Sequence, residues 1–234
     1  ANYRSNARKA MIWPWLANFL ASFVLTRWVI NALYDLPAER DLPAFASERF
    51  SRWFQQHDGV EGAEETVWLY VDPFTEFNEP EIGRAAVRVL EAGGVRVERL
   101  PIDDDGRTQL SKGFVREAKS LMEENLRDLE PLLEEHPDRR VVGLEPSALL
   151  TFRDETPDLV DVELRDVAED LAERSLLLEE YIAQASDAGT FEAGWGASDQ
   201  GNLKLHGHCH QKAVVGTEPT ERVLEMAGYE VETI

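Results

Sequence analysis

Short runs of apolar residues alternate along the chain with longer segments in which apolar residues recur every three or four positions. Short apolar runs are typical of buried strands, and the longer period is typical of helices with one apolar face. The pattern predicts strands at 66–74, 95–102, 139–147, 201–209 and 229–234, and helices at 78–94, 111–137, 161–185 and 218–228. Strands that alternate with helices indicate βαβ units and a mainly parallel sheet, so the expected fold class is α/β.

An internal repeat supports this prediction. Residues 88–100, "RVLEAGGVRVERL", align with residues 222–234, "RVLEMAGYEVETI", and share seven of 13 positions. A predicted strand precedes each copy, so one order of strand, loop, helix and strand occurs twice. The repeat therefore predicts two pseudo-symmetric βαβ-type units, in which both copies form a helix, a turn and a strand.

Residues 1–60 differ from this pattern and indicate helices joined by the proline-containing connector "DLPAERDLPAF". We expect a helical linker segment at 1–60 and an α/β domain at 61–234. The chain begins without a methionine, and its last predicted strand ends at Ile234. We therefore expect a segment of a longer protein, with the α/β domain incomplete at its C-terminal end.

The stretch Ala10–Thr26 contains no charged residue. Asn18, Ser22 and Thr26 would form one polar stripe on a helix, which favours burial against the rest of the protein or against a partner over a membrane span. A peripheral contact through the tryptophan-rich end is the alternative. The chain shows no signal-peptide pattern, and its one cysteine fits a reducing compartment. We expect a cytoplasmic location, and the alternative is a peripheral position on the inner face of the membrane.

Composition restricts the partners. The chain carries 45 Asp and Glu residues against 24 Lys and Arg residues, a net charge of −21. Nucleic acid is excluded as the main partner, because binding to phosphates requires clustered basic residues. Only five of the basic residues are lysines. The preference for arginine over lysine and the acidic surface suit a protein that works at high salt. An ordinary acidic protein is the alternative.

The segment "HGHCH", residues 206–210, contains three histidines and the single cysteine. Histidine and cysteine are common ligands of borderline metals. In an extended strand the three histidines would share one face and Cys209 would lie on the other, so a metal site requires a turn or ligands from elsewhere. Two other interpretations stay open, namely histidines hydrogen-bonded at a strand end and a nucleophilic Cys–His pair.

Other loops carry weaker signals. The stretch "DDDGR", residues 103–107, could bind a hard cation, although most acidic turns are solvated. Ser147 is placed to cap a helix that follows a strand, and the free backbone N–H groups there could instead bind an anion. Arg153 and Asp154 are placed to form a local ion pair. Residues 111–113, "SKG", indicate a helix start at which Lys112 could contact an anionic ligand.

Four motifs occur in an order that resembles a known family. They are "LYVDPFTEFNEPEIGRAAVRVLEAGGVRV", "GRTQLSKGFV", "GLEPSALLTFRDE" and "LHGHCHQKAVVG". Together they resemble the cysteine-rich (CCG) domain of FAD-linked oxidases fused to iron–sulfur domains. Similar domains occur in the iron–sulfur subunits of D-lactate dehydrogenase, glycolate oxidase and anaerobic glycerol-3-phosphate dehydrogenase, and in the cysteine-rich subunit of heterodisulfide reductase. The resemblance covers roughly residues 60–234.

The resemblance implies an oxidoreductase in which a flavin domain oxidises a 2-hydroxy acid. Electrons would pass through [4Fe–4S] clusters of a ferredoxin-like domain toward a quinone or another membrane-associated acceptor. Cysteines of the CCG domain would hold a further iron–sulfur centre or another metal. This chain departs from the pattern, because Asp104 and Asp105 precede the "GR" motif and Ala148 follows "EPS", where the family places cysteines.

The resemblance therefore implies a degenerate cluster site that holds zinc, a remnant iron–sulfur centre, or no metal. Its metal ligands would be Cys209, His208, His210 and Asp105 on converging loops. Arg107, Ser147 and Ala148 would complete the cofactor site. The expected function is an electron-transfer or docking domain, non-catalytic by itself, of an FAD- and iron–sulfur-dependent dehydrogenase for D-lactate or glycolate. The alternative is a stand-alone module that binds a metal or a small molecule.

Overall fold

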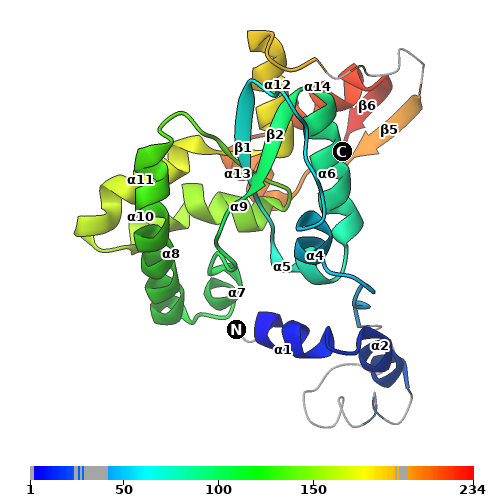
Figure 1. Cartoon of the computed structure of the whole chain (residues 1–234), viewed down its shortest axis with the longest axis vertical. Helices are drawn as coiled ribbons and strands as arrows, with labels where there is room; N and C mark the ends of the chain where they lie inside the picture. Colours follow the sequence, from blue (N-terminus) through cyan, green and yellow to red (C-terminus); the bar gives the residue numbers. More distant parts are fainter. Residues whose placement is uncertain (1–2, 24–25, 27, 29–41, 193, 195–199) are drawn as a thin grey trace. The chain divides into compact units, whose positions relative to one another are not determined.

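The computed structural model describes the chain except for residues 1–2, 24–25, 27, 29–41, 193 and 195–199 (Figure 1). The strands are β1 (Glu65–Tyr70), β2 (Val95–Arg99), β3 (Val141–Gly143), β4 (Ser175–Leu177), β5 (Gly201–Leu205) and β6 (Tyr229–Thr233). The longer helices are α1 (Tyr3–Ala10), α2 (Pro14–Ser22), α6 (Pro80–Ala92), α8 (Val115–Glu135), α9 (Pro146–Arg153), α11 (Arg165–Arg174), α12 (Leu178–Ala188) and α14 (Glu218–Met226). Short helices are α4 (Phe50–Phe54), α5 (Pro73–Phe77), α7 (Arg107–Leu110), α10 (Glu155–Leu159), η1 (Val162–Leu164) and α13 (Cys209–Val214).

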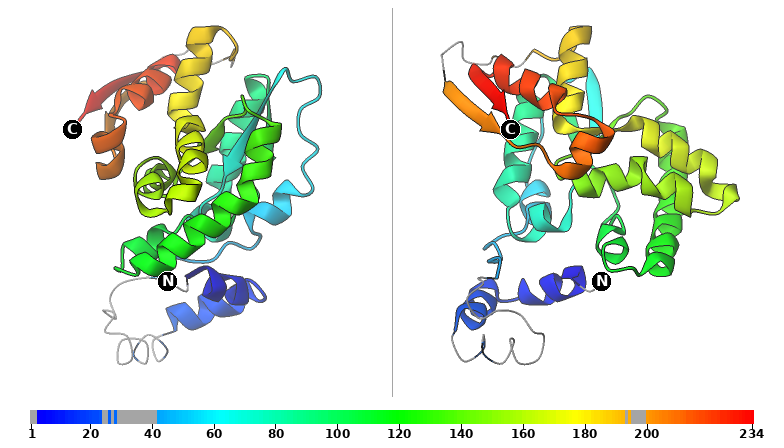
Figure 2. Two further views of the ribbon diagram at one scale, coloured as in Figure 1. Left: turned by 90° about the vertical axis from the view of Figure 1, so that its left-hand side faces the viewer. Right: turned by 180° about the vertical axis from the view of Figure 1, so that it is seen from behind.

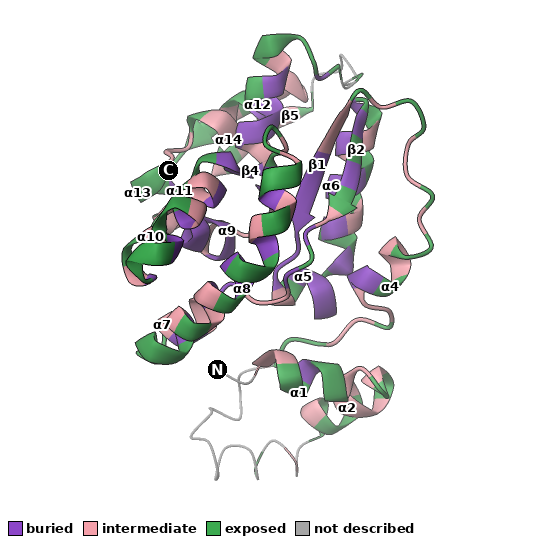
Figure 3. Cartoon of the chain, turned by 60° about the vertical axis from the view of Figure 1, so that its left-hand side comes forward, coloured by how far each residue is buried: buried purple, intermediate pink, exposed green. Residues whose placement is uncertain are grey.

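Four strands form a parallel sheet in the order β2-β1-β3-β4. Helix α6 connects β1 to β2, and α8 connects β2 to β3, as parallel pairing requires. Strand β1 lies between β2 and β3, and its last four residues are buried (purple in Figure 3). The α/β fold class predicted from the sequence is confirmed.

The core of this sheet is built from alternating side chains of β1. Trp68 and Tyr70 belong to one apolar cluster with α8, whose Met122 and Leu126 are buried. Val67 and Leu69 alternate with them and are also fully buried, because a central strand of a parallel sheet is covered on both faces. Pro131 lies inside α8 without ending the helix. The helix predicted at 111–137 therefore continues through this proline as α8.

The predicted helix at 161–185 is also wrong, because a strand divides it. Helix α11 ends at Arg174, β4 follows at once, and α12 begins at Leu178. All three residues of β4 are buried, and they pair in parallel with β3. Arg174 fixes the end of α11, since its guanidinium donates to the carbonyl oxygen of His136 over 2.9 Å. Pairing with β3 thus overrides the helical pattern of the local sequence.

The repeat forms the same elements twice, as predicted. In the first copy, α6 leads through a turn into β2, which pairs in parallel with β1. In the second, α14 leads into β6, which pairs in parallel with β5 in a separate two-stranded sheet (Figure 2). The shared glycine of each turn, Gly94 or Gly228, has a φ of 84° or 93°. Glycine adopts this left-handed conformation without steric cost.

Contacts divide the chain into two compact units. One contains Asp58–Asp72 and Ala85–Ile234, and the other contains Asn2–His57 and Pro73–Arg84. Within the second unit the ring of Tyr3 stacks on Phe74, with the ring centroids 5.2 Å apart. Glu76 is buried there and accepts hydrogen bonds from the amide and the hydroxyl of Ser51. The predicted domain boundary near residue 60 stays a prediction.

Helix α2 covers part of the uncharged stretch, and none of its residues is buried. Trp13 and Trp15 are 63% and 70% exposed, and Phe19 and Phe23 are also exposed. Burial of this stretch inside the chain is therefore wrong for the described residues, whereas a covering partner or a membrane surface stays a prediction. No helix in the described part of the chain has the length and apolar character needed to cross a membrane.

Candidate functional site

Acidic residues follow the strands of the main sheet at their carboxyl ends. Asp72 follows β1, Asp105 follows β2, Glu145 follows β3 and Glu180 follows β4. Parallel strands present their carboxyl ends at one edge, which is where α/β sheets place their ligand-binding loops. Asp72, Asp105 and Glu180 are buried. This edge of the sheet is therefore the candidate site.

Asp105 is held inside the protein by Tyr70 at the end of β1. The Tyr70 hydroxyl donates to Asp105 Oδ2 over 2.7 Å, and the backbone N–H of Arg107 donates to Oδ1 over 2.6 Å. Burial raises the pKa of Asp105 from 3.8 to about 7, although the two hydrogen bonds oppose the rise. The pKa of Tyr70 is raised well above 10 by burial and by the Asp105 carboxylate. Both oxygens of Asp105 thus already have donors.

Glu145, and not Ser147, caps helix α9. Glu145 Oε2 accepts from the backbone N–H of Ala148 and from the Ser147 hydroxyl, each over 2.6 Å. The predicted cap is therefore wrong. A carboxylate of the chain already occupies one of the amides that was expected to bind an anion. Ala148 itself is buried in the apolar core.

Arg153 pairs with Glu180, and not with its neighbour Asp154. Its Nη1 atom lies 2.9 and 2.8 Å from the two carboxylate oxygens of Glu180. Glu180 also accepts from the backbone N–H of Leu177 and so caps helix α12. The predicted local pair is wrong because Arg153 reaches the first turn of α12, whereas Asp154 lies between α9 and α10.

The histidine-rich segment does not continue its strand. Strand β5 ends at Leu205, and Cys209 and His210 belong to the short helix α13. His208 caps this helix, since its Nδ1 accepts from the backbone N–H of His210 over 3.2 Å. The predicted alternation of the histidines across an extended strand is therefore wrong. Cys209 is exposed, and α13 packs against α9.

This packing brings His210 next to two acidic residues. His210 Nε2 lies 3.2 Å from Asp154 Oδ2, and Glu155 follows directly. One ligand atom from each of the three side chains lies within 4.8 Å of the other two. Arg107, at the start of α7, donates to Glu155 Oε1. We name Asp154, Glu155 and His210 the triad.

Two of the residues predicted for the site meet at the triad: His210 is a member, and Arg107 contacts it through Glu155. Asp105, Ser147 and Ala148 make the separate contacts described above. Neither His208 nor Cys209 is a member of the triad. Asp154 and Glu155 were not predicted as partners of His210, and no local motif marks them, because α13 meets them only in the folded chain. The site composition expected from the family stays a prediction.

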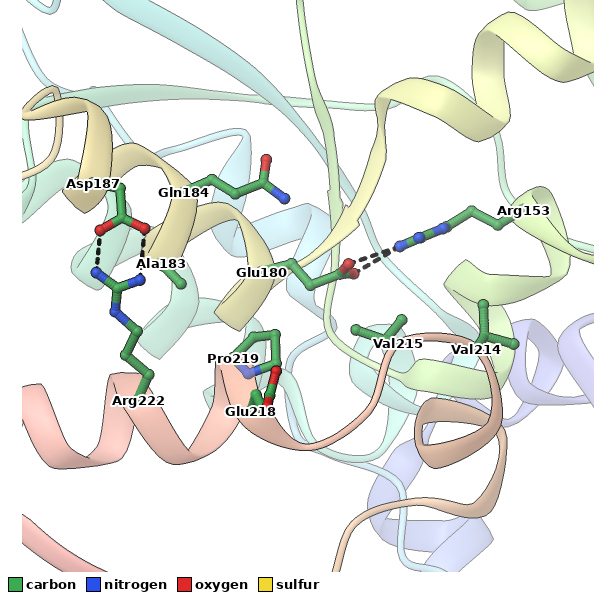
Figure 4. Close-up of a pocket in the computed structure, with 10 residues that line it drawn as sticks. All are labelled: Arg153, Glu180, Ala183, Gln184, Asp187, Val214, Val215, Glu218, Pro219 and Arg222. Atoms are coloured by element: carbon green, nitrogen blue, oxygen red, sulfur yellow. Dashed lines mark hydrogen bonds and ion pairs between the residues drawn. The ribbon is translucent and has the colours of Figure 1, made fainter.

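A cavity of about 410 Å³ lies beside the same helices, among α12, α13 and α14 (Figure 4). Arg153 and Arg222 line it, and each guanidinium is already paired, with Glu180 and Asp187 respectively (dashed lines in Figure 4). The Arg222 pair lowers the pKa of Asp187. Because both cationic groups have carboxylate partners, the cavity does not favour an anionic ligand.

The residues at the sheet edge do not fit an iron–sulfur cluster. Such clusters are held by several thiolates, and Cys209 is the single cysteine of the sequence. Asp105 is buried and bonded to Tyr70, and Ala148 offers no ligand atom.

Comparison with known proteins finds distant relatives. No protein-family model matches the chain, and no solved structure matches it. The chain is 26% identical over 158 residues to one subunit of the anaerobic glycerol-3-phosphate dehydrogenase of Escherichia coli K12, and equally to the same subunit from strain O157:H7. The match covers 64% of this chain, which spans about two fifths (39%) of each relative. The chain is therefore similar to part of a dehydrogenase subunit.

Proposed function

We propose that this chain is a docking segment within the electron-transfer subunit of a flavin- and iron–sulfur-dependent dehydrogenase. The observation that carries the proposal is the similarity over 158 residues to one subunit of an anaerobic dehydrogenase. The four ordered motifs described for the sequence agree with it. In this proposal the flavin part of the assembly oxidises the substrate, and clusters in a ferredoxin-like part carry the electrons toward a quinone.

Two classes of substrate are candidates for the assembled enzyme. Glycerol 3-phosphate appears in the name of the relatives. A 2-hydroxy acid such as D-lactate or glycolate is implied by the wider resemblance of the motifs. The proposal assigns neither substrate to this chain, because its role would be to position other parts of the assembly.

The donor set at the sheet edge supports docking over electron transfer by this chain itself. A single exposed cysteine, with Asp105 bonded to Tyr70 and with Ala148 in the core, does not provide the ligands of a cluster. We therefore assign no electron-transfer step to these residues. In the second unit, Trp13, Trp15 and Phe19 expose apolar surface, and exposed aromatic patches typically mark contacts with proteins or membranes.

Reconstitution tests the proposal. The genome that encodes the chain should also encode a flavin-binding dehydrogenase part and cysteine motifs for cubane clusters, in the same reading frame or nearby. The protein that contains this chain is purified and mixed with that flavoprotein, and their association is measured by light scattering. We expect a stable complex that transfers electrons from one of the two substrate classes to a quinone.

A pair of variants sharpens this test. Changing both Trp13→Ser and Trp15→Ser should weaken the association by at least about tenfold, because aromatic anchors dominate interfaces. Val162→Ser, which changes a side chain of 77% exposure in the other unit, should leave it unchanged. A protein that binds no flavoprotein and stays monomeric would contradict the proposal and favour the stand-alone metal-binding module.

A further inference from the structure

The triad gathers three metal-ligating side chains from separate parts of the sequence. Asp154 and Glu155 lie where α9 ends and α10 begins, and His210 lies in the first turn of α13. Their ligand atoms lie within 4.8 Å of one another. The packing of α13 against α9 fixes this arrangement, and the His208 cap fixes the start of α13. A site held by tertiary packing is preorganised for a ligand.

The distance between His210 and Asp154 already suits one metal ion. Zinc binds imidazole nitrogen and carboxylate oxygen at about 2.1 Å. Two such ligand atoms that subtend an angle of about 100° at the ion lie about 3.2 Å apart. This is the distance between His210 Nε2 and Asp154 Oδ2, which is 3.2 Å. An ion could replace their direct contact without moving either side chain far.

Unused bonding capacity in the triad is a second, independent observation. Glu155 Oε2 is buried and has no hydrogen-bond partner in the described part of the structure. Arg107 occupies only Oε1 of Glu155, so it orients the carboxylate and leaves Oε2 available. The side chain of His210 is only 11% exposed. Buried polar atoms without partners are rare in folded proteins and often mark a place where an ion or a water molecule binds.

Charge and access also favour a cation. With a neutral imidazole, the two carboxylates of the triad and the guanidinium of Arg107 give a net charge of −1, in a chain whose net charge is −21. The side chain of Asp154 is 55% exposed, which provides a route from solvent and room for water ligands. One imidazole with two carboxylates matches first-row divalent metals better than calcium or magnesium, which prefer oxygen alone.

We propose that Asp154, Glu155 and His210 bind one divalent transition-metal ion, zinc in the first place, with water in the remaining positions. The site contains no sulfur ligand, because Cys209 lies outside the triad. This ligand set differs from the one that the family resemblance implies and does not depend on the proposed role in a dehydrogenase.

Metal titration of the full chain tests this site. The protein is freed of metal with a chelator, and zinc is titrated into it by calorimetry. We expect one zinc ion per chain. His210→Ala and Asp154→Asn should each weaken binding by at least about tenfold, since even residues that only support a metal ligand contribute that much. Two matched controls, Cys209→Ser and His206→Ala, should leave the affinity within about twofold.

Cobalt gives a second readout that identifies the ligands. Cobalt bound to the triad should show visible absorption from nitrogen and oxygen ligands without a thiolate-to-cobalt band in the near ultraviolet. Such a band, or loss of binding in Cys209→Ser, would overturn the triad. Failure of the unaltered chain to bind zinc or cobalt would also overturn it. Circular dichroism checks the folding of each variant. If His210→Ala unfolds, the result for Asp154→Asn decides the test, because Asp154 is mostly exposed and its substitution should leave the fold intact.

Discussion

The two copies of the repeat have the same topology and very different surroundings. In the first copy, β1 and β2 contain buried residues, and β1 pairs with strands on both sides. In the second, no residue of β5 or β6 is buried, and these two strands pair only with each other within the described residues. The repeated sequence thus determines the path of the chain, whereas the neighbouring elements determine how much apolar surface each copy buries.

The loops that follow the strands also differ in burial between the two copies. After the first copy, the loop beyond β2 leads to Asp105, which is buried against Tyr70 and whose pKa is raised. The loop after β5 leads instead to His210, which meets Asp154 and Glu155 near the surface. The two loops are not equivalent in the repeat, because β5 corresponds to β1, which the buried Asp72 follows, and β2 corresponds to β6. The strand ends thus lead to a buried acid–phenol pair in the first copy and to a group of polar side chains near the surface in the second. Paired substitutions at equivalent positions can test this difference directly.

The largest difference in stability effect between equivalent substitutions should appear at the last aligned position of the repeat. Leu100 is fully buried, and its counterpart Ile234 is 60% exposed. Leu100→Ala should lower the free energy of unfolding by about 2–5 kcal/mol, because it leaves a cavity in the core. Ile234→Ala should change it by less than about 0.5 kcal/mol. Urea denaturation measures both values, and similar losses would show that the second copy is buried in solution.

The buried acid of the first copy should make stability depend on pH. Because burial raises the pKa of Asp105 to about 7, the folded state binds this proton more tightly than the unfolded chain does. Stability therefore falls as pH rises from about 4 to about 7. At about 1.4 kcal/mol per tenfold change in proton affinity, the loss reaches up to roughly 4 kcal/mol above pH 7.

Asp105→Asn removes this titration and should gain stability relative to the unaltered chain as pH rises from 5 to 8. Urea denaturation at pH 5 and at pH 8 measures the difference in unfolding free energy between the variant and the unaltered chain. Tyr70→Phe should move the transition to higher pH, since the lost hydrogen bond favours the charged carboxylate. A difference that stays constant between pH 5 and pH 8 would mean that Asp105 is solvated.

The turn between helix and strand should tolerate a Cβ atom less well in the first copy than in the second. A Cβ atom on Gly93 would lie 2.2 Å from the ring of Phe191, and the equivalent residue of the second copy is Ala227. Gly93→Ala should therefore cost about 1–3 kcal/mol through overpacking. Ala227→Gly should cost no more than about 1 kcal/mol. Adding Phe191→Leu should recover part of the Gly93→Ala loss, and strictly additive effects would exclude this contact as the cause.

The smallest effect concerns the arginine that begins each repeat. Arg222 pairs with Asp187 on the exposed surface, and its counterpart Arg88 is exposed without an ion pair in the described part of the chain. Exposed pairs contribute little and are screened by salt. Arg222→Ala should cause a small loss of stability at low salt that disappears at high salt, whereas Arg88→Ala should cause none. A loss that persists at high salt would indicate a packing role for Arg222.

Most of the fold could be predicted from periodicity, because five of the six strands coincide with apolar runs flanked by turn residues. Strand β4 could not. Its three residues, Ser175–Leu177, lie inside a sequence whose apolar spacing suits a continuous helix. Pairing with β3 determines their conformation, and three residues are too short to show a period of their own.

The residues of the candidate site were harder to predict from the sequence than the fold was. His210 could be selected by its residue type, and Arg107 by its motif. Asp154 and Glu155 were not associated with His210, because they are 55 or more positions away and meet it only through the packing of α13 on α9. The position of His210 also depended on where β5 ends, and strand ends are the least predictable part of such patterns.

The register of the strands also has a consequence for how the chain folds. In the first copy Glu65 pairs with Val95, and in the second Gly201 pairs with Tyr229, so each pairing closes a loop of similar, short length. The pairing of Trp68 with Val141 closes a much longer loop. By the logarithmic dependence of closure entropy on length, the longer loop costs roughly 0.8 kcal/mol more. Each repeat is thus a local kinetic unit, and we expect the first to form before β3 and β4 join its sheet.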